Sequence, residues 1–409
     1  MKNGVHGDPS SGLRALAAAA DADAAFAPDT LLDDAAYATK CAPVLSRDER
    51  AAFEAACRGF AGEAPRLTPL GRTRAAHVLR ESLAKLLRVR SYVDRFPAIA
   101  DTKLERPIFI VAPFRTGTTF LHRLLAQDPQ LRWLRTWEGT LAPPAEPELR
   151  LDPRYFDLDG RIATVERSLG RLHRMNPRLR DVHATGARLP EECFGLLETA
   201  FTAHSFVFYG CVPDYFEWLD RCSEAHWLES YRLYALQLAL LQWWSPSARW
   251  VLKSPVHLWN LDALLGVFPD ALIVLLHRDP LCCVPSFCRL LATHHAFAYR
   301  RIDEHAIGAL AHDYTRKVLA RAAGARSRFP AERFLDLDYE GLLSDPLECV
   351  RRVYGRAGTE LTVVAEERMR DWLAQQPLPA TGREYSAAQY GLDARALARD
   401  FQDWSTVRV

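Results

Sequence analysis

Apolar residues recur at helical spacing through the first part of this chain. In "RTRAAHVLRESLAKLLRVRSYVDRF" they fall every three or four positions, with arginines between them, which is the pattern of a helix that buries one face. The same character extends from about residue 10 to 95, so we expect a helical N-terminal extension over residues 1–104. The buried face of its last helix is predicted to contain Ala75, Val78, Leu79, Leu83, Leu86 and Leu87.

Short uninterrupted apolar runs then predict buried strands. The clearest are "RPIFIVA", "RWVLKSP", "ALIVLLHRDP" and "RFLDLDY", and helical spacing follows them, as in "TTFLHRLLAQDP". Continuous apolar character is typical of strands covered on both faces, and strands that alternate with helices form right-handed parallel sheets. The chain is therefore predicted to have an α/β fold with a parallel β-sheet flanked by helices.

The middle of the chain lacks a strong strand pattern. Residues 152–246 are predicted to form a mainly helical insertion, a lid or substrate-binding part of the domain over residues 105–409. The stretch "TWEGTLAPPAEPEL" before it is broken by prolines and is predicted to be a loop. Most aromatic residues of the insertion are expected in the core, but if a few line a pocket the ligand is apolar or aromatic. These residues are Phe201, Phe206, Phe208, Tyr209, Tyr215, Phe216, Trp218, Trp227, Trp243 and Trp244.

Composition narrows the class of protein. The net charge is +1, from 52 basic and 51 acidic residues, so no nucleic-acid partner is expected. No apolar run reaches the roughly 18 residues of a membrane-spanning helix. The alanine-rich start is broken by Arg14, Asp21 and Asp23, which favours a helix capped near Ser10 or Ser11 over a signal peptide. Nine cysteines without paired or zinc-ligand spacing predict a reducing, cytoplasmic location and no metal site.

Polar residues follow three of the predicted strands. Because the carboxyl ends of parallel strands meet at one edge of a sheet, where ligands bind, we expect these residues to gather there. The first group is P-loop-like, since a glycine and hydroxyl residues at a strand-to-helix turn wrap a phosphate. It lacks the lysine of the usual P-loop, however. The three groups are Arg115-Thr116-Gly117-Thr118-Thr119, Lys253-Ser254-Pro255, and His277-Arg278-Asp279-Pro280 with Ser286 beyond it.

These segments resemble the sulfotransferases that use 3′-phosphoadenosine 5′-phosphosulfate (PAPS). "PIFIVAPFRTGTT" is similar to the family's 5′-phosphosulfate loop, and "LIVLLHRDPLCCVPSFCRL" is similar to its 3′-phosphate motif. "WVLKSPVHL" resembles the segment between them that carries a lysine. An arginine at residue 115, together with "RTGTT", "PEE" and "KSPxHL", is typical of the broad, mostly bacterial branch. The resemblance is densest from about 105 to 140 and from 185 to 350.

The resemblance implies roles for individual residues. Residues 105–409 would form a sulfotransferase domain that moves a sulfonate group from PAPS to an acceptor hydroxyl by in-line transfer, without a metal. The acceptor would be a small molecule or lipid. Arg115 and Lys253 would neutralise the charge that develops on the leaving phosphate. The residues implied to bind the cofactor are Arg115, Thr116, Gly117, Thr118 and Thr119 at the 5′-phosphate, and Arg278 and Ser286 at the 3′-phosphate.

The acceptor hydroxyl needs a base within hydrogen-bond reach, and three residues are candidates. His257 lies four residues beyond Lys253, in the segment that carries a catalytic histidine in several branches. Glu191 and Glu192 follow Pro190, which is predicted to start a helix and to direct both carboxylates from its first turn. Related enzymes use either a histidine or a glutamate, so the choice stays open.

Two features stand outside this assignment. The basic, glycine-containing C-terminal segment of many family members is absent in that form, and Arg383 and Tyr385 are candidates for part of its role. His294 and His295 have no partner spacing and are predicted to be surface residues. The alternative functions are a kinase-like phosphotransferase, which would need a Walker lysine and an acidic magnesium ligand, and a nucleotide-binding protein that has lost catalysis.

Overall fold

The structure is a computed structural model that describes residues 24–140, 160–182, 185–244, 249–376 and 386–402. The predicted helix near Ser10, and the candidate residues Arg383 and Tyr385, lie outside the described residues.

One five-stranded parallel sheet forms the centre of the protein, as predicted. Its strand order is β2-β3-β1-β4-β5. Four of the strands are those expected from the apolar runs. The fifth, β2, has two residues and pairs Leu131 with Arg249 at the edge of the sheet. The strands are β1 (Ile108–Val111), β2 (Leu131–Arg132), β3 (Arg249–Lys253), β4 (Leu272–His277) and β5 (Phe334–Asp338).

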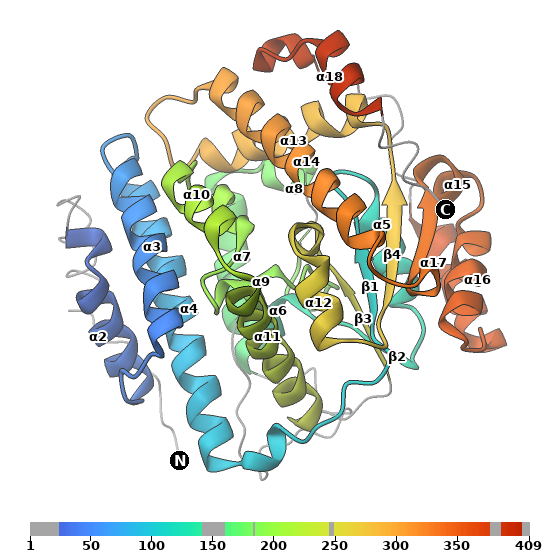
Figure 1. Ribbon diagram of the computed structural model, residues 1–409, viewed down its shortest axis with the longest axis horizontal. Coiled ribbons are helices and arrows are strands. Elements are labelled where there is room, and N and C mark those ends of the chain that lie inside the picture. Colours follow the sequence, from blue (N-terminus) through green and yellow to red (C-terminus); the bar gives the residue numbers. More distant parts are fainter. Residues whose placement is uncertain (1–23, 141–159, 183–184, 245–248, 377–385, 403–409) are drawn as a thin grey trace.

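Helices cover both faces of the sheet, which makes the expected α/β fold (Figure 1). Alternate side chains of a strand point to opposite faces, so Phe109 and Ile273 join one core while Ile108 and Val274 join another. The second core contains residues of α5 (Thr118–Leu125), α16 (Pro346–Ala357) and α17 (Val363–Gln375). Other helices after the strands are η6 (Pro255–Trp259), α12 (Leu261–Val267), α13 (Pro280–His295), α14 (Glu304–Arg326), η7 (Ala331–Arg333), α15 (Tyr339–Ser344), η8 (Ala387–Tyr390) and α18 (Ala394–Asp400).

The described part of the N-terminal extension is helical up to residue 99. All six residues predicted for the inner face of α4 are buried, and they share one hydrophobic core with Phe109 and Ile273 of the sheet. Ser46 and Glu49 cap each other's backbone at the start of α3, which fixes where that helix begins. The elements are η1 (Ala24–Phe26), α2 (Pro28–Thr39), α3 (Arg47–Glu63), α4 (Pro69–Arg95) and η2 (Pro97–Ile99).

The described part of the insertion is also helical, as expected. Of the ten aromatic residues named above, six are buried, Phe208 among them, and the other four pack against the core. None of the described helices combines the length and apolar character needed to cross a bilayer. The elements are α7 (Gly160–Met175), α8 (Leu179–Val182), α9 (Phe194–Glu198), η5 (His204–Phe208), α10 (Pro213–Arg221) and α11 (Glu224–Trp244).

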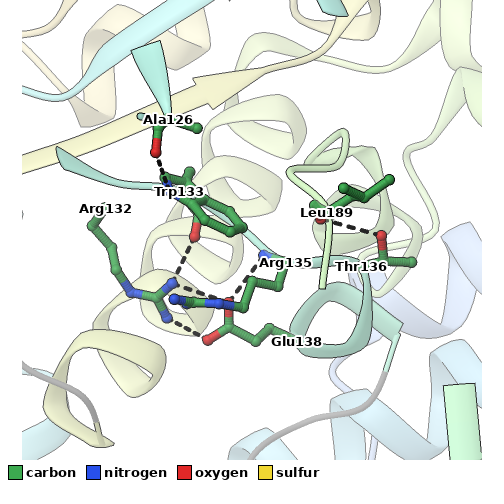
Figure 2. Close-up of polar contacts among 7 residues, drawn as sticks. All are labelled: Ala126, Arg132, Trp133, Arg135, Thr136, Glu138 and Leu189. Carbon is green, nitrogen blue, oxygen red and sulfur yellow. Dashed lines mark hydrogen bonds and ion pairs between the residues drawn. The ribbon is translucent and has the colours of Figure 1, made fainter. Parts of the chain in front are cut away.

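The predicted loop at residue 136 and the predicted surface position of His295 were wrong. The first part of the predicted loop is a short helix, α6 (Thr136–Thr140), because Glu138 accepts a 2.9 Å hydrogen bond from the Arg135 backbone and closes the turn (Figure 2). His295 is fully buried rather than at the surface, since its Nε2 hydrogen-bonds the Val207 carbonyl at 2.7 Å. His294 is half-buried, and its ring packs against Phe208.

Candidate active site

The loop between β1 and α5 has the backbone of an anion-binding turn. Gly117 has a φ of 88° and Arg115 has a φ of 71°, so two nearby residues adopt the left-handed conformation. Thr116 is buried and its hydroxyl donates to the Pro113 carbonyl at 2.9 Å, which holds the turn closed. Thr118 begins α5, and the first amides of a helix have no acceptor within it. Amides in this position can bind a phosphate.

Gly117 is required at this turn for two reasons. Its φ is unfavourable for any other residue, and a Cβ there would come within 2.8 Å of the Tyr339 ring. We expect Gly117→Ala to destabilise the protein by about 1–3 kcal/mol and to weaken binding of 3′-phosphoadenosine 5′-phosphate (PAP), measured by urea denaturation and calorimetry. Gly355→Ala is the control, because nothing lies within 4 Å of its added Cβ. Equal stability of both variants would contradict the expectation.

The two predicted phosphate sites adjoin each other at Arg115. Its Nε donates to the Ser286 hydroxyl at 3.1 Å, and its carbonyl accepts from Arg278 Nη1 at 2.7 Å. The Arg278 guanidinium also lies 4.1 Å from the centroid of the Tyr339 ring. These contacts hold Arg115 in a conformation that is costly for a non-glycine residue. The guanidiniums of Arg115 and Arg278 are therefore fixed at the carboxyl ends of β1 and β4.

Lys253 connects the loop with the insertion. Its Nζ donates to Glu192 Oε1 at 2.7 Å and to the Thr119 hydroxyl at 3.3 Å. The lysine side chain is 1% exposed and the glutamate side chain 12%, so the pair interacts in a poorly solvated environment. Glu192 Oε2 is buried and has no hydrogen-bond partner among the described residues. The site thus presents one paired and one unpaired carboxylate oxygen.

The position of Glu192 is set by backbone hydrogen bonds on both sides of it. Glu191 N donates to the Leu134 carbonyl at 3.0 Å, and Cys193 N donates to the Lys253 carbonyl at 3.1 Å. The Glu191 carboxylate accepts from the Glu192 backbone at 2.8 Å. The predicted helix does not start at Pro190; α9 begins only at residue 194.

A buried ion pair at α6 adjoins the segment that carries Glu191 and Glu192. Glu138 binds the guanidinium of Arg132 and lies 3.4 Å from that of Arg135 (Figure 2). Burial would raise the pKa of Glu138, but the two arginines keep it below its ordinary value. Thr136 N donates to the Leu189 carbonyl at 3.1 Å, which attaches α6 to the segment before Glu191. This network was not predicted, because Glu138 was assigned to a loop and neither arginine was singled out.

His257 lies apart from this arrangement. It is fully buried, its Nδ1 is 2.9 Å from the Tyr231 hydroxyl, and its Nε2 is 3.2 Å from Cys193 Sγ. Burial lowers its pKa to about 3. Both ring nitrogens are therefore occupied, and the ring is a weak base. Of the three candidate bases, the geometry favours Glu192.

Tyr339 and a buried ionic network at the ends of β4 and β5 were missed by the sequence analysis. His277 Nε2 is 2.6 Å from Asp336 Oδ1, and Arg326 makes two hydrogen bonds to the same carboxylate. Burial would raise the pKa of Asp336, but these partners lower it to about 2. The network lies beside Arg278 in the chain and joins the two strands that carry Arg278 and Tyr339.

Comparison with known proteins identifies the class of protein that this fold and site define. A model of the sulfotransferase family matches residues 107–363, and the chain belongs to that family. This membership sets aside the kinase-like alternative.

Three relatives place the chain within the family. It is similar to the crystal structure of sulfotransferase STF1 from Mycobacterium tuberculosis, with 31% identity, a TM-score of 0.79, and coverage of 92% of this chain and 98% of that one. Sulfotransferase STF9 from Mycobacterium avium gives 30% identity, a TM-score of 0.80, and coverage of 93% and 96%. The omega-hydroxy-beta-dihydromenaquinone-9 sulfotransferase Stf3 of Mycobacterium bovis is 26% identical over 76% of each chain.

Proposed function

We propose that this protein transfers the sulfonate group of PAPS to the hydroxyl of a small apolar or aromatic molecule or lipid. The observation that carries the proposal is Lys253, which contacts Thr119 on the loop side and Glu192 on the insertion side. A cation in this position adjoins both the leaving phosphate and the base. Its location supports in-line transfer between a donor in the loop and an acceptor beside the glutamate.

The nucleotide would occupy the edge of the sheet where the strands end. The amides of Thr116, Gly117, Thr118 and Thr119 and the hydroxyls of Thr118 and Thr119 would surround the 5′-phosphate, with Arg115 beside it. Arg278 and Ser286 would bind the 3′-phosphate. The short contacts of both residues with Arg115 support two phosphate sites that share one wall. Forked guanidinium donors suit this task.

The transfer forms one bond and breaks one. The acceptor oxygen bonds to sulfur as the bond between sulfur and the 5′-phosphate oxygen breaks, and PAP leaves with that electron pair. Lys253 and Arg115 neutralise the negative charge that grows on the leaving oxygen. The acceptor proton passes to Glu192 Oε2, which has no partner within the described part of the chain. Glu191 and His257 are the less favoured bases, since both already hydrogen-bond within the protein.

The acceptor class rests on two observations. The insertion places Phe208 against the loop that follows β1, with its ring 5.7 Å from that of Phe114. The similar protein Stf3 is named for a hydroxylated menaquinone acceptor. Both support an apolar or lipid alcohol.

All nine cysteines are free thiols, which is consistent with the proposed cytoplasmic location.

Calorimetric titration of PAP tests the cofactor assignment. Wild-type protein should bind PAP at least tenfold more tightly than adenosine 5′-phosphate. Arg278→Ala should bind PAP about 10- to 100-fold more weakly, because charge-assisted hydrogen bonds contribute about 1.5–3 kcal/mol. Its affinity for adenosine 5′-phosphate should stay nearly unchanged.

Arg356→Ala is the matched control. This exposed arginine lies at the end of α16, close to the residues where β3 and β4 begin, whereas the proposed site lies where the strands end. Equal affinity of wild type for the two nucleotides would refute the PAPS assignment. Tight PAP binding without sulfonate transfer to any alcohol would instead favour a nucleotide-binding protein that has lost catalysis.

A further inference from the structure

A cluster of aromatic residues from η5, η6 and α14 contains several buried polar atoms that have no partner among the described residues. The ring of His204 is 3.9 Å from that of Trp259 and 5.6 Å from that of Tyr314, and the last two rings stack at 6.0 Å. His204 Nε2, Trp259 Nε1 and the Tyr314 hydroxyl are all buried, and none has a hydrogen-bond partner within the described residues. A buried polar group without a hydrogen-bond partner destabilises the folded state. Three in one cluster indicate a missing polar partner.

The cluster packs against neighbours in the chain of two segments that were assigned to the donor, and it includes a residue that follows the third. Phe114 precedes Arg115, Phe287 follows Ser286, and Trp259 lies six residues beyond Lys253. The Tyr314 ring is 5.7 Å from Phe114 and 5.9 Å from Phe287, and those two rings stack at 4.4 Å. The cluster therefore packs against residues that adjoin both proposed phosphate sites in the chain. His204 is contributed by the insertion, and Tyr314 by α14.

Tyr314 is also near the proposed base. Burial raises the pKa of its hydroxyl, and the negative charge of Glu192 raises it further, so the tyrosine remains protonated and is a hydrogen-bond donor. Burial, together with the charges of Arg321 and Lys317, lowers the pKa of His204 well below its ordinary value. The histidine is therefore neutral. An apolar wall with a few directed polar atoms is the usual composition of a small-molecule site.

We propose that His204, Trp259 and Tyr314 form the acceptor site, in which Tyr314 orients the reacting hydroxyl of a planar aromatic alcohol. This inference rests on the proposed function. The Tyr314 hydroxyl donates a hydrogen bond to the acceptor oxygen, while Glu192 Oε2 removes the proton of the acceptor hydroxyl. Another lone pair of the acceptor oxygen attacks the sulfur of PAPS. The edges of the indole and imidazole rings contact the aromatic frame, because their faces already pack against other side chains, among them Arg321 on Trp259 and Phe216 on His204. Trp259 Nε1 and His204 Nε2 bind a second oxygen atom or water.

The test uses 2-naphthol as the probe, with the full-length protein. Equilibrium dialysis measures its binding to the PAP-loaded protein, and turnover with PAPS measures transfer. We expect wild type to bind and sulfonate 2-naphthol. Tyr314→Phe should lower kcat about tenfold, the effect of one hydrogen bond to the reacting atom, with PAP affinity unchanged. Trp259→Phe should weaken 2-naphthol binding several-fold and provides a second variant if Tyr314→Phe does not fold.

Tyr354→Phe is the control, because it removes a buried hydroxyl on α16 that hydrogen-bonds Asp128, away from the cluster. Absence of 2-naphthol binding to the PAP-loaded wild type would overturn the acceptor site, as would equal kcat values in wild type and Tyr314→Phe. Either result leaves the proposed donor intact if PAP still binds. Failure of wild type to bind PAP would instead overturn the proposed function itself.

Discussion

Glu192→Gln is expected to lower the rate of sulfonate transfer by about 10²- to 10⁴-fold, the usual contribution of a general base. The amide keeps the size of the side chain and can still accept a hydrogen bond from Lys253, but it cannot take the proton of the acceptor. The measurement is single-turnover transfer from PAPS to 2-naphthol. PAP affinity should change only a few-fold, because Glu192 is linked to the phosphate loop only indirectly, through the Lys253 contacts with Glu192 and Thr119.

Two further variants make this test specific to Glu192. Glu191→Gln and His257→Asn remove the other candidate bases, and each should have a smaller effect on transfer than Glu192→Gln. Since Glu192→Gln leaves Lys253 as a buried charge without its partner, the variant should lose about 3–5 kcal/mol of stability. The rates are therefore measured at saturating PAPS, after the fold has been checked by circular dichroism. A larger loss in either of the other variants would assign the base there.

Acid is expected to destabilise this protein well above the range in which carboxylates titrate. Burial lowers the pKa of His122 and His257 to about 3 and that of His295 to about 4. The unfolded chain binds these protons near pH 6.5, whereas the folded chain does not. Stability is therefore full above pH 6.5 and falls as the pH decreases. At pH 5 the loss is roughly 2 kcal/mol for each histidine, or about 6 kcal/mol in total.

Urea denaturation at pH 8, 6.5 and 5 measures this loss. His122→Gln should show a pH dependence that is smaller by roughly 2 kcal/mol between pH 8 and 5, since glutamine does not titrate. Asp336 does not interfere, because its pKa of about 2 lies below its unfolded value, so its contribution declines only below about pH 4. A free energy of unfolding that stays constant from pH 8 to 5 would show that these histidines have ordinary pKa values.

The sequence predicted those parts of the fold that local pattern determines. Continuous apolar runs identified four of the five strands, because a buried parallel strand must be apolar on both faces. The strand-to-helix turns carried Arg115, Lys253 and Arg278, and the sheet brings these residues to one edge. β2 was missed, since two residues give no pattern. The short helix α6 was missed because Glu138 closes it by a tertiary ion network rather than by helical spacing.

Residues that depend on packing between distant segments could not be predicted. His295 gives no sequence sign of burial, and its partner is a backbone carbonyl in the insertion. The ring of Tyr339 packs against both Gly117 and Arg278. These three residues follow different strands and come together only in the folded sheet. The choice among His257, Glu191 and Glu192 likewise depended on which side chain already had partners, a property of the packed core.

The hydrogen bond from Cys193 N to the Lys253 carbonyl has a consequence for how such an enzyme can diversify. It ties the proposed base to the strand that carries the proposed catalytic lysine, so these two groups keep their separation whatever surrounds them. His204 and Tyr314 are supplied by η5 and α14, which lie outside that linkage. Substitutions in η5 and α14 are therefore expected to change which acceptors bind, in evolution or in the laboratory. The separation of Glu192 and Lys253 would not change.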